Sequence, residues 1–454
     1  MYSPKKQKII VIGGNDAGLS AAGRAKRRNP RLEVVVLEKT PNCGYASCGL
    51  PYMISGQVSS DELRGPDPIS IEQKRGFKVL VNHQAVRIDP LKRRVLVRNV
   101  LNDYESELDY DRLILATGAQ PIVPQFAQVR ADNLFHLRNF QDAQRLSAFI
   151  QKNNPQKALI IGAGYIGLEM AEAFIKLNMN VTVVEKEERI FPQFEKELSG
   201  QILKSINAAG LEFKLNKEVS ELVVENNRII GAKLVQDKAL LAADLVFIST
   251  GIKPDVRLAV DAGIPLGATG AILVNKNQQT RRMDIFAAGD CCESVHVVTG
   301  KPVWMPFAGI ASKQGRVAGD NVAGGHSTFP GVVGSAMVQV FGLEIANTGL
   351  SYTQAIEQGF DARLTTITHD AKPSYIRDHS KITVALVTDN SSKKVLGVQM
   401  LGREGVGHRL NVLATAIAAK LTVNDLAYLD FGYTPTINTM WDAVQVAASV
   451  ALRK

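Results

Sequence analysis

Cysteine and histidine are scarce in this sequence. Four of the 454 residues are cysteine, too few for the disulfide framework that stabilises small secreted domains. We therefore expect a protein of a reducing compartment and predict a cytoplasmic one. The 7 histidines form no cluster with the spacing of metal ligands. No metal site is predicted.

Long apolar runs are also missing. No stretch reaches the roughly 18 uninterrupted apolar residues that mark a membrane-spanning helix. The longest uncharged candidate, 329–343, contains a proline, a glutamine and three glycines. Long Lys/Arg runs and basic stretches interleaved with aromatic residues are absent, which argues against a nucleic-acid-binding module. The net charge of +9 favours small anionic ligands such as phosphates and coenzymes.

A strand–turn–helix–strand pattern occurs twice. The first copy consists of an apolar run at 8–12, a glycine-rich turn at 13–18, a helical pattern at 19–28 and a second apolar run at 33–37 that closes with Glu38. The second copy has the same parts at 158–161, 162–167, 168–177 and 181–184, and closes with Glu185. The order of parts predicts two βαβ units.

The two turns have the chemistry of dinucleotide sites. Their glycines permit a tight turn and let backbone N–H groups approach a pyrophosphate at a helix N-terminus. The acid that closes each unit accepts a hydrogen bond from a ribose hydroxyl. Glu38 lies 20 residues after Gly18, and Glu185 lies 18 after Gly167, close to the spacing of this motif. Asn15 replaces the middle glycine of the first turn, so the second turn is the cleaner match.

Further markers divide the chain into domains. Two strands that end in Thr-Gly, within 113–121 and 245–254, predict passages between the two units. An apolar strand within 280–290 ends in Asp290, which we expect to face a ligand. Beyond about residue 330, alternating segments predict an antiparallel sheet followed by helices. We predict an α/β fold with two Rossmann-like domains, the first discontinuous, and a C-terminal α+β domain; their bounds are 1–121 with 245–330, 122–244, and 331–454.

A cysteine segment follows the first unit. Cys48 opens the sequence Cys-Gly-Leu-Pro-Tyr at 48–52, and Cys43 precedes it with four residues between them. A cysteine at the start of a helix beside a flavin can have a lowered pKa, which makes it a nucleophilic thiolate. We therefore expect Cys48 to be reactive.

These features together resemble the FAD-dependent pyridine nucleotide-disulfide oxidoreductases over essentially the whole chain. The sequence is most similar to the branch with a single cysteine, which contains coenzyme A-disulfide reductase, NADH-dependent persulfide reductase, NADH oxidase and NADH peroxidase. The resemblance implies FAD at the first unit and NAD(P)H at the second. It also implies a homodimer whose C-terminal domain completes the partner's active site.

The resemblance also assigns roles to residues. Cys48 matches the redox cysteine, Tyr165 the ring that covers the flavin until nicotinamide displaces it, and Glu169 an acid near that pocket. Glu185 favours NADH because a carboxylate repels a 2′-phosphate, while Lys186 and Arg189 leave NADPH open. The full set of implied cofactor-binding residues is Gly13, Gly14, Gly18, Glu38, Lys39, Thr117, Gly118, Asp290, Gly162, Gly164, Tyr165, Gly167, Glu169, Glu185 and Gly251.

Other matches indicate the reaction. Asp16 stands where the peroxidase and the water-forming oxidase have a histidine, which argues against peroxide or oxygen as the main substrate. Tyr375 and Tyr433 match tyrosines of the coenzyme A-disulfide and persulfide reductases, so we predict a phenol near the sulfur. Phosphates of coenzyme A would meet basic residues; the candidates are Arg24, Lys26, Arg27, Arg28, Lys74 and Arg75. We predict an NAD(P)H-dependent flavoprotein that reduces coenzyme A disulfide or a coenzyme A persulfide or polysulfide.

Two alternatives stay open. Cys43 and Cys48 have the separation of the dithiol pair in glutathione reductase-like enzymes, although the lysine and the His-Pro dipeptide of those enzymes are missing. A reduced flavin can also pass electrons to oxygen, which would make the protein a peroxide-forming NADH oxidase. Cys291 and Cys292 are expected to be packed in the core. With the sequence ending at Lys454, we expect no appended rhodanese domain.

Overall fold

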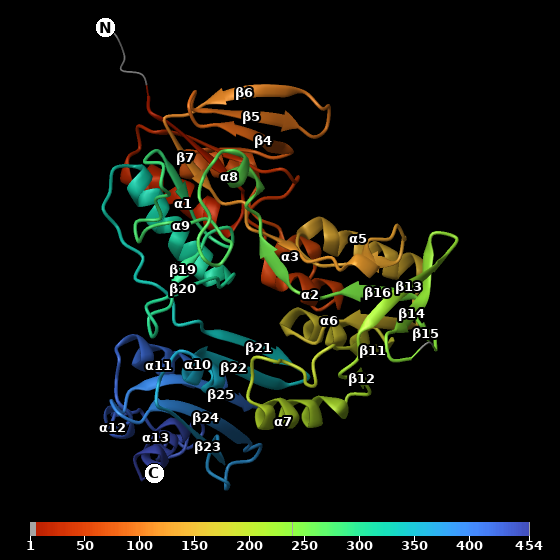
Figure 1. Ribbon diagram of the computed structural model, residues 1–454, viewed down its shortest axis with the longest axis vertical. Helices are drawn as coiled ribbons and strands as arrows, with labels where there is room; N and C mark the ends of the chain where they lie inside the picture. Colours follow the sequence, from red (N-terminus) through yellow and green to blue (C-terminus); the bar gives the residue numbers. More distant parts are fainter. Residues whose placement is uncertain (1–5, 238, 454) are drawn as a thin grey trace.

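The computed structural model describes residues 6–237 and 239–453 and contains three five-stranded sheets (Figure 1). Two of these sheets are parallel and carry helices, and the third is antiparallel. The predicted α/β fold, with two Rossmann-like domains and a C-terminal α+β domain, is confirmed. None of the described helices is long and apolar enough to cross a membrane.

The first sheet has the strand order β18-β7-β1-β2-β3, and all its strands are parallel. Its strands read as continuous apolar runs because both faces are covered. They are β1 (Lys8–Ile12), β2 (Glu33–Leu37), β3 (Lys78–Leu80), β7 (Arg112–Leu115) and β18 (Ile285–Ala287).

Helices α1 (Asp16–Arg28) and α9 (Ala308–Val322) pack against each other over the first sheet. Their backbones come very close: a Cβ atom added to Gly315 or Gly319 would lie 2.2 Å from the carbonyl oxygen of Ala17 or Ala21. Arg24 on α1 adds an ion pair to Asp320 on α9, with Nη2 at 2.7 Å from Oδ1. Helix α1 is therefore held closely against α9.

Short elements complete the first domain. The segment after β2 forms a 3-10 turn at Ser47–Gly49 and three helices, α2 (Leu50–Ile54), α3 (Ser60–Leu63) and α4 (Pro68–Arg75). An antiparallel sheet of β4 (His83–Asp89), β5 (Arg94–Asn99) and β6 (Glu105–Asp109) lies at the outer end of the molecule (Figure 1). Helix α8 (Arg257–Asp261) packs on β4, and β19 (Ser294–Val295) pairs with β20 (Pro302–Val303).

The second domain repeats the architecture. Its parallel sheet has the order β12-β11-β10-β16-β9, formed by β9 (Leu134–Phe135), β10 (Lys157–Ile161), β11 (Asn180–Val184), β12 (Glu212–Lys214) and β16 (Leu245–Ile248). Its helices are α5 (Phe140–Asn153), α6 (Tyr165–Lys176) and α7 (Lys196–Asn207). A small antiparallel sheet of β13 (Val219–Glu225), β14 (Arg228–Leu234) and β15 (Leu241–Ala242) packs beside it, as does a 3-10 turn at Gln125–Ala127.

The return to the first domain comes later than the sequence predicted. Residues from 245 onward were assigned to the first domain, but β16 pairs with β10 in the second sheet. Its four residues are all buried, so this strand completes the second core before the chain leaves. The passages themselves are β8 (Ala119–Pro121) and β17 (Ile252–Pro254), which pair as an antiparallel ribbon between the two domains.

The C-terminal sheet has the order β21-β22-β25-β24-β23 and is covered on both faces. One face packs on helices α11, α12 and α13, and the other shares an apolar core with the second domain. This is why β24 and β25 have almost no exposed position. The strands are β21 (Ala336–Val340), β22 (Leu343–Gly349), β23 (Ala362–Asp370), β24 (Lys381–Asp389) and β25 (Val395–Gly402), and the helices are α10 (Tyr352–Glu357), α11 (Val406–Ala418), α12 (Val423–Ala427) and α13 (Ala443–Arg453).

A buried ion pair fastens α11 to the start of α13. The Arg409 side chain is 2% exposed and the Asp442 side chain 4%, with Nη2 at 2.8 Å from Oδ2. The Arg409 guanidinium also donates to the carbonyl oxygens of Gly405 and Ala371. All three nitrogens of the buried Arg409 guanidinium therefore donate to an acceptor. Removing either Arg409 or Asp442 would leave the charge of the other uncompensated in the core.

We predict that Arg409→Met lowers the free energy of unfolding by about 3 to 5 kcal/mol, because it strands the Asp442 carboxylate in the core. Lys381→Met, which breaks the exposed pair with Asp370, should cost less than about 1 kcal/mol. Denaturant unfolding followed by circular dichroism measures both. Equal losses in the two variants would contradict the prediction.

Candidate active site

The first glycine-rich turn is closed by a carboxylate. Gly13 has φ +113°, and a Cβ there would lie 2.1 Å from the carbonyl oxygen of Ala116, so no other residue fits this close approach. Glu38 Oε2 accepts the backbone N–H of Gly14 at 2.8 Å, and Oε1 accepts the N–H and hydroxyl of Thr40. The acid predicted to meet a ribose thus also holds the shape of the turn.

The second turn is built the same way. Glu185 is buried, and its Oε2 accepts the backbone N–H of Ala163 at 2.7 Å. A Cβ on Gly167 would lie 2.1 Å from the carbonyl oxygen of Gly162, whereas a Cβ on Gly164 would meet no atom within 4 Å. Gly164 therefore leaves open space at the start of α6, where a pyrophosphate fits.

The first turn also borders a space for a ligand. Asn15, in the place of the middle glycine, has a buried Oδ1 without a hydrogen-bond partner among the described residues. Beside it opens a cavity of about 420 Å³. A buried acceptor without a partner is the arrangement expected where a ligand with a donor group completes the site.

Cys48 lies in the 3-10 turn before α2 and is exposed to solvent. The apolar residues Leu50 and Ile54 of α2 anchor this segment in the central core. Burial by the surrounding protein raises the pKa of the Cys48 thiol, and the charge of Asp16 raises it further. Glu169 and Asp290 act in the same direction, whereas a hydrogen bond from Ser47 opposes them.

The protein chain by itself therefore shifts the pKa of Cys48 in the direction that favours the thiol, and a thiolate beside a bound flavin stays a prediction. The prediction rested on the start of a helix, and α2 has only five residues. Burial, the largest cause of the raised pKa, and the charges of Asp16, Glu169 and Asp290 act against the effect of so short a helix.

Asp290, one of the acids that raise the pKa of Cys48, forms an ion pair with Arg138. Arg138 Nη2 lies 2.7 Å from Asp290 Oδ2, and its Nε donates to the carbonyl oxygen of Ala119. Burial and the charge of Asp290 raise the pKa of Asp16, and Arg138 lowers it. The sequence analysis missed Arg138, because the only signal near it is the capping pattern of α5, which begins two residues later.

Glu169 and Tyr165 lie on α6. Burial, with a smaller effect from the charge of Glu172, raises the pKa of Glu169 to about 7. The hydroxyl of Tyr165 donates to Oδ1 of Asn347 in the C-terminal domain at 2.6 Å, and its ring packs edge-on against Phe191. Displacement of the ring, as the family resemblance implies, requires that hydrogen bond to break.

The other predicted cofactor residues line the passages between domains or the rim of the turns. The hydroxyl of Thr117 donates to the carbonyl oxygen of Asp255 at 2.6 Å. Gly118 has φ +75° and adjoins the Arg138 guanidinium, and the carbonyl oxygen of Gly251 accepts from Ile122 in the ribbon. Lys39 is exposed beside Glu38.

The remaining cysteines are buried. Cys43 packs in the core beneath α1, its thiol facing the carbonyl oxygen of Pro66. Burial and the charges of Glu38 and Asp67 raise its pKa to about 11. Cys291 and Cys292 are directed at backbone carbonyl oxygens. All four thiols are free, so Cys43 and Cys48 form no disulfide here.

Tyr375 and Tyr433 lie together on the C-terminal domain. Both side chains are exposed, and a hydrogen bond with Tyr375 raises the pKa of Tyr433. The structure thus brings the two predicted phenols into one place, on a surface open to solvent. Exposed apolar side chains surround Tyr433 in the sequence, namely Tyr428, Ile437, Met440 and Trp441.

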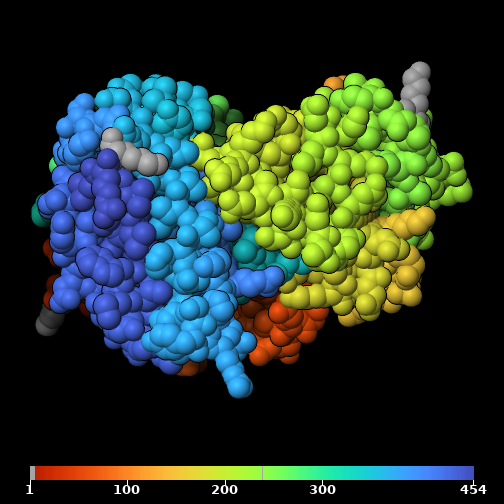
Figure 2. All heavy atoms as spheres, turned by 90° about the horizontal axis from the view of Figure 1, so that it is seen from below, coloured from red at the N-terminus to blue at the C-terminus, as the bar shows by residue number. Residues whose placement is uncertain are grey.

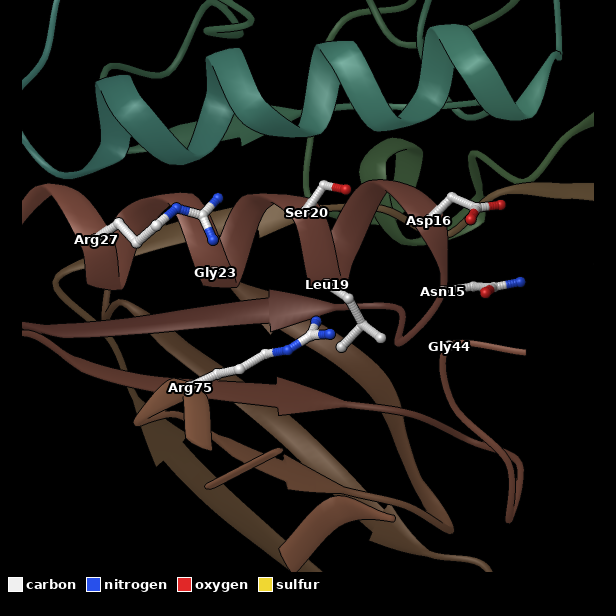
Figure 3. Close-up of a pocket in the computed structure, with 8 residues that line it drawn as sticks. All are labelled: Asn15, Asp16, Leu19, Ser20, Gly23, Arg27, Gly44 and Arg75. Carbon is white, nitrogen blue, oxygen red and sulfur yellow. The ribbon is translucent and has the colours of Figure 1, made fainter. Parts of the chain in front are cut away.

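The basic residues separate into two groups. Arg24 pairs with Asp320, Arg28 lies 4.0 Å from the same carboxylate, and Lys26 donates to backbone carbonyls. Arg27 on α1 and Arg75 on α4 instead line one end of the cavity, with Asn15 and Asp16 at the other end (Figure 3). Two of the six predicted phosphate ligands are therefore placed to meet a ligand in the cavity.

We predict that Glu169→Gln flattens the dependence of stability on pH. Because the folded pKa of about 7 exceeds the unfolded value, the folded state holds the proton more tightly, and stability falls as pH rises from about 4.5 to 7. The variant should be more stable than the wild type at pH 8, by at most about 3 kcal/mol, and equal to it at pH 4. Unfolding midpoints across this range measure the effect. Parallel pH profiles of variant and wild type would contradict it.

Comparison with known proteins gives a match over nearly the whole chain. The family model described as pyridine nucleotide-disulphide oxidoreductase matches residues 7–315, and the model described as its dimerisation domain matches 335–444. The chain is 36% identical over 447 residues to the protein of Pyrococcus furiosus named NAD(P)H sulfur oxidoreductase (CoA-dependent), covering 98% of this chain and 99% of that one.

Two further relatives are similar over their length. A protein of Methanocaldococcus jannaschii named NADH oxidase is 30% identical, with 98% of this chain and 99% of that one covered. The solved structure of an NAD-dependent persulfide reductase from A. fulgidus superimposes with a TM-score of 0.95 at 34% identity, covering 98% of this chain and 83% of that one. The resemblance inferred from the sequence is confirmed: the chain belongs to the pyridine nucleotide-disulphide oxidoreductase family.

Proposed function

We propose that the protein reduces coenzyme A disulfide, or a coenzyme A persulfide or polysulfide, with electrons from NAD(P)H that reach the substrate through Cys48. The main observation in support concerns Asp16. Its charge acts on the pKa of Cys48, and it also lines the cavity that contains Arg27 and Arg75. One site thus combines an exposed thiol with a basic end suited to phosphates. The names of the Pyrococcus furiosus and A. fulgidus relatives support this acceptor class.

FAD and NAD(P)H are the cofactors of this family, and the two turns fit them. Gly13, Gly14, Gly18 and Glu38 would hold FAD at the first turn, with Asp290 beyond it. Gly162, Gly164, Gly167 and Glu185 would hold the pyridine nucleotide, and the buried Glu185 carboxylate favours NADH over NADPH. When bound, FAD accepts a hydride from NADH and makes two electrons available to the sulfur.

The reaction at the substrate sulfur is carried out by Cys48. The Cys48 thiolate attacks one sulfur of the substrate disulfide, forms a mixed disulfide and expels the other half as a thiolate. Two electrons from NADH reduce the mixed disulfide, which regenerates Cys48 and releases the second thiol. One NADH and one proton are consumed for each disulfide. Because the chain raises the Cys48 pKa, we expect the attack to accelerate as pH rises.

We propose that Tyr375 and Tyr433 act in a homodimer, at Cys48 of the partner subunit. Their exposure and the effect of Tyr375 on the pKa of Tyr433, together with the match to a dimerisation domain, support this. A phenol there would donate a proton to the departing thiolate. The four free cysteines support a reducing compartment, the cytoplasm.

The second candidate function is a peroxide-forming NADH oxidase, which the relative from Methanocaldococcus jannaschii favours by its name. It needs the same two cofactor sites but neither the cavity nor the tyrosines. The dithiol alternative would need Cys43 to reach Cys48. Cys43 packs instead in the core, facing Pro66, and this placement supports the single-cysteine mechanism.

Each of the three proposed roles, FAD binding, NAD(P)H binding and dimerisation, falls to one domain. Residues 1–121 and 249–330 form the proposed FAD-binding domain, and 122–248 the proposed NAD(P)H-binding domain, with the boundary moved to the end of β16. Residues 331–454 form the proposed dimerisation domain.

We predict that Cys48→Ser lowers NADH-dependent reduction of coenzyme A disulfide by at least about a hundredfold, because serine cannot form the mixed disulfide. Cys43→Ser is the matched control and should keep most of the activity in a protein that still folds. Anaerobic loss of NADH absorbance measures both. Unchanged turnover in Cys48→Ser would sink the sulfur assignment, and equal loss in both variants would favour the dithiol.

We predict that Arg27→Ala and Arg75→Ala each raise the KM for coenzyme A disulfide about tenfold, since each removes a charge-assisted contact to phosphate. Pantethine, the corresponding disulfide without the phosphates and without the adenosine, should show an unchanged KM. Lys74→Ala is the control on α4, because Lys74 does not line the cavity. A KM for pantethine that rises as much as that for coenzyme A disulfide would rule out the phosphate role.

A further inference from the structure

Two amide side chains of the C-terminal sheet face the second domain. Asn347 on β22 and Gln399 on β25 stand directly opposite each other in the antiparallel register. Asn347 accepts the Tyr165 hydroxyl from the start of α6, and Gln399 contacts the loop before α7. The two domains lie against each other along this boundary (Figure 2).

The side chain of Gln399 forms hydrogen bonds to the backbone of the loop 191–195. Its Oε1 accepts the N–H of Glu195 at 2.7 Å, and its Nε2 donates to the carbonyl oxygen of Gln193 at 3.0 Å. The Glu195 side chain adds a third contact, because its Oε1 accepts the N–H of Tyr352 at 2.9 Å. Gln399 is 3% exposed, so water does not compete for these bonds.

The loop begins with a strained residue. Phe191 is fully buried with φ +44°, a left-handed conformation that costs a bulky residue stability unless its surroundings enforce it. Its N–H donates to the carbonyl oxygen of Ala163 at 3.2 Å, and its ring packs on Tyr165. The hydrogen bonds of Gln399 to Gln193 and Glu195 hold the backbone just after Phe191 and so help to keep it in this conformation.

Ala163 lies inside the second glycine-rich turn and is held from both sides. Its N–H is bound by Glu185 and its carbonyl oxygen by Phe191. The shape of this turn therefore depends on Glu185, which follows β11, and on the loop that Gln399 holds.

We propose that Gln399 and Glu195 position the loop 191–195 and thereby set the affinity of the second glycine-rich turn for the pyridine nucleotide. They act through Phe191 and Ala163 and are positioning residues. The inference rests on the proposed nucleotide site. It gives the C-terminal domain a role in nucleotide binding within its own chain, separate from dimerisation.

The test measures NAD⁺ binding to the FAD-loaded protein by titration calorimetry, together with KM and kcat for NADH. Gln399→Met should raise the Kd for NAD⁺ and the KM for NADH about tenfold, and Glu195→Ala about threefold, from the hydrogen bonds lost. The kcat at saturating NADH should stay within about twofold of wild type, as positioning of a binding turn predicts. Glu195→Gln keeps the acceptor oxygen and should bind NAD⁺ like the wild type.

Thr383→Val is the matched control. It removes the hydrogen bond to Gln201 across the same boundary without touching the loop, and NAD⁺ binding should not change. Wild-type affinity in both Gln399→Met and Glu195→Ala would overturn the inference, as would an equal loss in Thr383→Val. If Gln399→Met does not fold, the comparison of Glu195→Ala with Glu195→Gln tests the inference. Wild-type protein that binds no NAD⁺ would overturn the proposed nucleotide site, and the inference with it.

Discussion

One apolar core, shared by all three domains, places the parts of the site relative to one another. Leu50 and Ile54 of the helix after Cys48 belong to it, as do the inner faces of α5 and α6 and the residues Val338 and Ile345 of the C-terminal sheet. Because protein interiors are close-packed, a shift of any one layer would move the others. Cys48, the proposed nucleotide turn and the C-terminal domain are therefore held in one arrangement.

Charge is divided along the site in a way that suits a large anionic disulfide. Burial and the charges of Asp16, Glu169 and Asp290 raise the pKa of Cys48, whereas Arg27 and Arg75 lie at the other end of the cavity from Asp16. Phosphates held at the basic end would stay away from the acidic end, where the sulfur reacts.

Local motifs could be read from the sequence, and contacts between distant segments could not. The glycine-rich turns and their acids lie within about 25 residues of each other, so spacing alone singled out Glu38 and Glu185, although their hydrogen bonds to the turn backbone appear only in the structure. Arg138 and Asp290 are 152 residues apart, and no local pattern connects them. The same holds for Arg24, which belongs to the basic helix end but pairs with Asp320 rather than a ligand. The charges that act on the pKa of Cys48 escaped prediction because the three acids come from three segments.

The most direct test of the account is anaerobic NADH consumption by the FAD-loaded protein, with coenzyme A disulfide, polysulfide and glutathione disulfide offered separately beside an aerobic sample without them. The account predicts rapid anaerobic turnover with coenzyme A disulfide or polysulfide and little with glutathione disulfide, which lacks the phosphates that Arg27 and Arg75 would bind. Consumption of NADH in the aerobic sample alone would contradict it and establish an oxidase instead.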